Sequence, residues 1–195
     1  MKFTSTQDFT SLTELLRFYG DADEIVFKSQ CTLNEADIAE ACHNGRWLAN
    51  RLRLRNGSKG VEGIVIGYGC RVVHEAWQVA DGKIVFLGEC LLHHKDGGAV
   101  IRVNSDATKS LAELMAQWAD ETERRWFSEE KIVEVVIAHE LFHLLGQHSE
   151  SRTASTLVEL AAHAFARAMT ELPFSPLLFN ALLVRLATGN RTLTL

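Results

Sequence analysis

Two histidines and a glutamate lie within five consecutive residues, His139-Glu140-Leu141-Phe142-His143. On a helix, residues four apart project from the same side one turn apart, so both imidazoles can reach one point. Two histidines in this arrangement are typical of a zinc site, and Glu140 could take a proton from a zinc-bound water. The spacing therefore predicts metal-assisted hydrolysis of a peptide bond.

The residues around this motif predict a buried helix over 128–145. Ser128 is expected to cap it, and Gly146 is expected to end it. Between them, apolar side chains occur nearly all round the helix. Two histidines and a glutamate are costly to bury unless something pairs them, and a metal ion does so. A hydrogen-bonded structural network and a site that has lost its activity are the alternatives.

A catalytic zinc usually has three protein ligands and one position for water. A histidine three residues after Gly146 would complete one known pattern, but that residue is Ser149. Glu159 is the favoured third ligand, with His148, His163 or no third ligand as alternatives. If Glu159 is the ligand, His163 would orient a ligand from one turn further along. Thr156 precedes Glu159 by three residues, so Glu159 could instead close a capping box.

The rest of the chain predicts a small sheet flanked by helices. Helices are expected over 11–19, 32–55, 109–126, 128–145, 157–171 and 176–189, and strands over 61–66, 70–79, 83–92 and 99–104. Asp81-Gly82 and Asp96-Gly97-Gly98 are hairpin signals. These elements predict an α+β fold in which a small antiparallel sheet packs with helices and the H-E-x-x-H helix is buried.

Composition limits the classes of protein that need to be considered. The 195 residues are 47% hydrophobic, with no repeat or linker, which predicts a single domain over 1–195. A net charge of -5 argues against nucleic acid as a partner. No apolar run is long enough to cross a membrane, and the four cysteines form no C-x-x-C pair. We therefore expect a cytoplasmic protein.

Three segments resemble the ImmA/IrrE-type zincin metallopeptidases. They are the strand Val100-Ile101-Arg102-Val103-Asn104, the metal-helix segment from Ile137 to His148, and Glu159-Leu160-Ala161-Ala162-His163-Ala164-Phe165-Ala166-Arg167. The last is similar to that family's E-x-x-A-N-x-F-A-A signature, with His163 in place of the usual Asn. The resemblance implies a zincin-like, gluzincin-like fold with Glu159 as the third zinc ligand. It also implies a protein or peptide substrate of a regulatory or repressor type.

The sequence thus predicts a zinc metallopeptidase in which Zn²⁺ is bound by His139, His143 and Glu159 and Glu140 is catalytic. The alternative is a catalytically inactive zincin-fold regulatory or protein-binding module. The strand over 99–104 could serve as an edge that pairs with an extended substrate. Candidates for stabilising the oxyanion of the reaction are Tyr68, His74, His93, His94 and His163.

Overall fold

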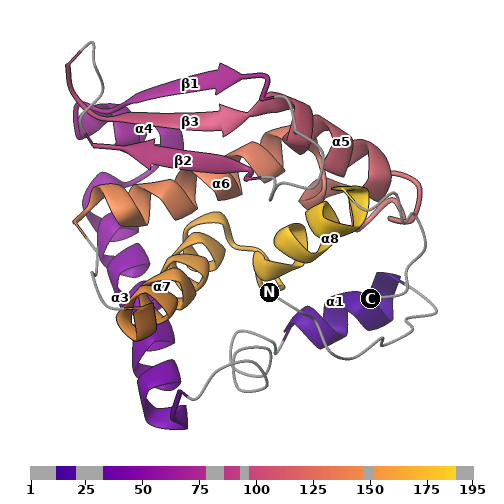
Figure 1. Cartoon of the computed structure of the whole chain (residues 1–195), viewed down its shortest axis with the longest axis horizontal. Coiled ribbons are helices and arrows are strands. Elements are labelled where there is room, and N and C mark those ends of the chain that lie inside the picture. The colour runs from indigo at the N-terminus through magenta and orange to yellow at the C-terminus, as the bar shows by residue number, and fades with distance from the viewer. Residues whose placement is uncertain (1–11, 21–32, 78–85, 93–96, 147–151, 188–195) are drawn as a thin grey trace.

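The computed structural model of this chain is an α+β arrangement, which confirms the predicted fold class (Figure 1). It describes residues 12–20, 33–77, 86–92, 97–146 and 152–187. Within these residues the elements are α1 (Leu12–Gly20), α3 (Glu35–Asn56), α4 (Val61–Gly67), β1 (Arg71–Glu75), β2 (Gly88–Leu91), β3 (Val100–Asn104), α5 (Ser105–Met115), the 3-10 helix η1 (Arg124–Trp126), α6 (Glu129–Leu144), α7 (Arg152–Thr170) and α8 (Leu177–Ala187).

The sheet is mixed, so the expectation of an antiparallel sheet was wrong. Its strand order is β1-β3-β2, with β1 parallel to β3 and β2 antiparallel to β3. In a meander β2 would pair with both other strands, whereas here β3 lies between β1 and β2. The successive strands β2 and β3 pair antiparallel, as a hairpin signal predicts, but β1 pairs with β3 instead of with β2, the next strand in the chain.

The segment expected to be the first strand, residues 61–66, is part of helix α4. Its buried side chains are Val61, Ile64 and Val65, which have the spacing of one helix face. A short apolar run suits a buried strand or a buried helix equally well, and β-branched residues favoured the strand. Burial against neighbouring elements decides between them here, and the helix forms.

The helix expected over 109–126 starts earlier and ends earlier in the structure. Asn104 caps its start, and a turn at Asp120 follows its end. The Asn104 side chain accepts from the Ala107 backbone N–H, which caps α5 four residues ahead of the expected start. After α5, Asp120 Oδ1 accepts from the backbone N–H groups of Thr122 and Glu123. This turn separates α5 from η1, so the apolar pattern after Met115 does not form one continuous helix.

Helix α6 lies in the middle of the fold, where it contacts β2 and β3 on one side and α7 on another (Figure 1). Helix α3 packs along α7, and Gly45 of α3 lies against the α7 backbone. A Cβ atom added to Gly45 would lie 2.2 Å from the Ala161 carbonyl oxygen. No helix in the described part of the chain is both long enough and apolar enough to cross a membrane.

Candidate metal centre

Helix α6 presents the motif much as the sequence predicts. Ser128 caps its N-terminus by accepting from the Lys131 backbone N–H, and Gly146 follows its end with φ at 81°. Most of its length is buried, Glu140 and His143 included. The histidine rings of residues 139 and 143 therefore project from a rigid, enclosed helix, and their side chains are only 16% and 11% exposed.

Glu159 on α7 reaches both histidines of α6. Nε2 of His139 lies 3.3 Å from Glu159 Oε2, and Nε2 of His143 lies 3.3 Å from Glu159 Oε1. The two Nε2 atoms are themselves 3.2 Å apart. These three donor groups form what we call the ligand cluster, and they are the group among the described residues whose His, Cys, Asp and Glu atoms converge closely enough to hold a metal ion.

The spacing of the two imidazole nitrogens in the ligand cluster is close to that around a tetrahedral zinc ion, and a carboxylate oxygen lies near each of them. Ligands at about 2.0–2.1 Å from zinc in tetrahedral geometry lie about 3.3–3.4 Å from one another. The two Nε2 atoms are 3.2 Å apart, and each lies 3.3 Å from one oxygen of the Glu159 carboxylate, His139 from Oε2 and His143 from Oε1. Each Nε2 atom carries at most one hydrogen, so the two imidazoles supply at most two hydrogen bonds among these three close contacts. One cation at the centre can satisfy all three.

Glu159 does not cap its helix, so the capping interpretation of Thr156 and Glu159 was wrong. Helix α7 begins at Arg152, five residues before the expected start, which places both residues well inside it. Glu159 is thus held by a helix, with its side chain 46% exposed. Although burial raises its pKa, hydrogen bonds and positive charge from His139 and His143 outweigh burial, and the pKa lies well below its usual range. The carboxylate is therefore ionised and available as a ligand.

Glu140 is buried beside the ligand cluster. Loss of solvent raises the pKa of its carboxyl group, although the nearby His139 and His143 oppose this change. For His139, burial lowers the pKa, but the hydrogen bond to Glu159 and the charges of Glu140 and Glu159 more than compensate and raise it. The cluster is thus an electrostatically coupled group with a buried base next to the two imidazoles.

His163 lies one turn after Glu159 and is 6% exposed. Its ring centroid is 4.7 Å from that of His139, but it is not part of the ligand cluster. Burial, followed by the charge of His139, lowers the pKa of His163 to about 3, so its ring is neutral. Its Nδ1 atom is buried without a hydrogen-bond partner among the described residues. His163 is therefore placed to pack against the ring of His139.

Other residues singled out from the sequence lie away from this arrangement or outside the described residues. His148, the alternative third ligand, lies outside the described residues, as do His93 and His94. Tyr68 follows α4 and is 47% exposed, and His74 lies on β1, at the opposite edge of the sheet from β2.

Among the described strands, β2 is the edge strand beside α6, so the expectation that residues 99–104 form an edge was wrong. Strand β3 is central, with β1 and β2 on its two sides. A Cβ atom added to Gly88 on β2 would lie 2.5 Å from Val136 Cγ1 and 3.5 Å from Glu140 Cγ. Sequence reasoning overlooked Gly88, although a glycine inside a strand often marks the close approach of another segment.

Searches against protein family models, curated proteins and solved structures found no match for this chain.

Proposed function

We propose that this chain is a zinc-dependent metallopeptidase in which His139, His143 and Glu159 hold the ion and Glu140 is the general base. The observation that carries the proposal is the convergence of donor atoms from two helices at 3.2–3.3 Å from one another. Local helix geometry brings the two imidazoles together, but it does not bring a carboxylate from α7 to both. This convergence supports a metal site rather than a chance motif.

Zinc in such a site supplies a Lewis acid that lowers the pKa of water and polarises a peptide carbonyl. A carboxylate oxygen of Glu140 accepts a proton from the attacking water and later delivers it to the amine nitrogen of the leaving product. Burial raises the pKa of Glu140, so its carboxylate holds this proton more readily than an exposed glutamate would. Low exposure of His139 and His143 limits competing contacts with solvent.

The surroundings of Glu140 support an extended protein or peptide substrate. Among the described strands, β2 pairs with β3 on one side only, and Gly88 brings it close to Glu140. A peptide that added to the free edge of β2 would therefore pass beside the general base. Together with the resemblance to ImmA/IrrE-type enzymes, this favours a zincin-like fold that acts on a regulatory or repressor protein.

The test combines metal analysis with hydrolysis of a proteome-derived peptide library, using protein purified without a histidine tag. We expect about one zinc per chain and cleavage products that are absent with Glu140→Gln, which should retain zinc. Glu129→Gln, an equivalent change in the exposed first turn of α6, is the control and should cleave normally. Zinc below roughly 0.2 per chain would contradict the metal site. Zinc binding without cleavage by the unaltered protein would instead favour the inactive regulatory module.

A further inference from the structure

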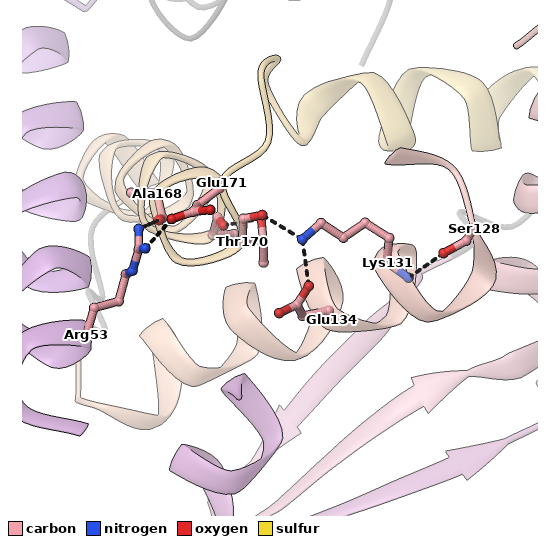
Figure 2. Close-up of polar contacts among 8 residues, drawn as sticks. Arg53, Ser128, Lys131, Glu134, Ala168, Thr170 and Glu171 are labelled. Carbon is pink, nitrogen blue, oxygen red and sulfur yellow. Dashed lines mark hydrogen bonds and ion pairs between the residues drawn. The ribbon is translucent and has the colours of Figure 1, made fainter. Parts of the chain in front are cut away.

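Two cationic side chains from different helices meet the C-terminal end of α7 (Figure 2). Lys131 Nζ, from α6, donates to the Thr170 carbonyl oxygen at 2.6 Å and pairs with Glu134 Oε2 at 2.7 Å. Arg53, from α3, donates to the Ala168 carbonyl oxygen at 3.2 Å and forms an ion pair with Glu171. The last carbonyl groups of a helix lack partners within the helix, so both contacts satisfy groups that would otherwise be unpaired.

The positive charge of Lys131 does not stabilise its own helix. It lies in the first turn of α6, where the helix dipole favours acidic side chains such as Glu129 and Glu130. The same charge faces the C-terminus of α7, where the dipole favours a cation. Its side chain is only 20% exposed, so it is largely withdrawn from water. The benefit of this lysine therefore comes from its contact with α7.

The two helices that Lys131 connects are those that hold the ligand cluster. His139 lies eight residues after Lys131 on α6, and Glu159 lies eleven residues before Thr170 on α7. These separations correspond to about 12 Å and about 16 Å along the helix axes. The lysine contact and the ligand cluster are thus two separate points at which one helix is fixed along the other.

The packing of α7 against α6 combines an aromatic contact with these polar contacts. The ring of Phe165 lies 5.5 Å from that of Phe142 on α6, and several other buried residues of α7 are small, namely Ala161, Ala162, Ala164 and Ala166. Small residues allow close approach but interlock less than large ones. A metal ligand must be placed within about 0.2 Å, so a small displacement of α7 would take the Glu159 carboxylate out of range.

We propose that Lys131 is a positioning residue that sets the axial position of α7 against α6 and so holds Glu159 in place opposite His139 and His143. Arg53 supports the same helix end from α3. The inference rests on the proposed metal site. Lys131 does not touch the ligand cluster and acts through the Thr170 carbonyl and the body of α7.

The test is a double-mutant cycle in zinc affinity, measured by competition with a chromophoric chelator. Lys131→Met should weaken zinc binding by about 10-fold, as is typical for residues that orient ligands, and Lys131→Arg should recover most of the loss. In a Glu159→Gln background, Lys131→Met should change affinity by less than about two-fold, because the ligand it positions is already lost. Lys109→Met, on the exposed surface of α5, is the matched control.

Two results would overturn this role for Lys131. One is unchanged zinc affinity in Lys131→Met; the other is an equal loss in both backgrounds, which would mark Lys131 as a general stabiliser. Urea unfolding of the metal-free proteins separates stability from affinity. If Lys131→Met does not fold, Glu134→Gln replaces it in the cycle, since it removes the ion pair that holds Nζ. An unaltered chain that binds no zinc would refute the metal site itself, and this role with it.

Discussion

Nε2 of His139 lies 3.2 Å from Nε2 of His143, and both face the Glu159 carboxylate. Because one cation can satisfy all three contacts, metal removal should destabilise the folded chain. With free zinc at 100 times its dissociation constant, the free energy of unfolding should rise by about 2.7 kcal/mol. Thermal unfolding with zinc and with a chelator measures this difference. A His139→Ala/His143→Ala variant should show none, and an equal melting temperature for the unaltered chain under both conditions would contradict the prediction.

Replacing Glu159 separates metal binding from the stability of the fold. Glu159 lies well inside α7, so Glu159→Gln should weaken zinc binding by at least about 10-fold while metal-free stability changes little. Isothermal titration with zinc and urea unfolding give the two quantities. Glu113→Gln on the exposed face of α5 is the control. A stability loss of about 1 kcal/mol with zinc affinity unchanged would show that Glu159 stabilises the fold without binding the metal.

The close approach of β2 to α6 should affect peptide hydrolysis more strongly than it affects zinc binding. A Cβ atom at residue 88 would lie 2.5 Å from Val136 Cγ1 and 3.1 Å from the Arg102 carbonyl oxygen. Gly88→Ala should therefore shift the edge strand away from Glu140 and lower kcat/KM by 10-fold to about 100-fold with zinc retained. Val136→Ala in the same chain removes the tighter contact and should restore part of the activity. Normal activity of Gly88→Ala alone would argue against substrate binding along β2.

The contact between α3 and α7 predicts a large stability effect at Gly45. Its added Cβ would lie 2.2 Å from the Ala161 carbonyl oxygen and 3.0 Å from the Phe165 backbone nitrogen. Backbone atoms cannot move aside singly, so Gly45→Ala should cost roughly 1–3 kcal/mol of unfolding free energy. In α4, Gly63→Ala meets only Lys59 Cβ at 3.9 Å and should stabilise by up to about 1 kcal/mol. Urea denaturation measures the unfolding free energy of both variants. Equal changes in the two would show that α3 and α7 can move apart to accommodate the added methyl group at residue 45.

The environment of Cys90 predicts slow reaction of its thiol. Burial raises the pKa of Cys90 to about 12, and the negative charges of Glu140 and Cys70 act in the same direction. Only the thiolate is nucleophilic, so alkylation at pH 8 should be on the order of 100-fold or more slower than in unfolded protein. The rate should rise about tenfold per pH unit between 8 and 10. Iodoacetamide labelling followed by mass spectrometry measures it at the Cys90 peptide.

The same labelling experiment reports on the position of Glu140. Glu140→Gln removes one negative charge near Cys90 and should lower the pKa of its thiol, which raises the labelling rate at fixed pH. Glu129→Gln, whose charge lies in the first turn of α6, should leave the rate unchanged. An unaltered rate in Glu140→Gln would show that the charge of Glu140 does not reach the edge strand.

Local features of the sequence were sufficient to predict helix α6. The capping serine, the following glycine and the four-residue spacing of the histidines all act within a few residues, so they predict a helix that Ser128 caps and Gly146 ends, and the shared side of His139 and His143. Strand β3 follows from its run of Val and Ile in the same way. The α+β class follows from the order of these elements.

Tertiary structure alone decided the features that depend on partners distant in the chain. The run Val61–Ile66 has both helical and strand character, and burial selected the helix. Which strand lies at the centre of the sheet, whether β1 runs parallel to β3, and whether Glu159 faces α6 or only its own helix are all set by packing between segments. The sequence therefore determined one side of the ligand cluster. Its other side required α7 to be placed against α6, because the energy that places one helix against another comes from contacts between them, such as Phe142 with Phe165 and Lys131 with Thr170.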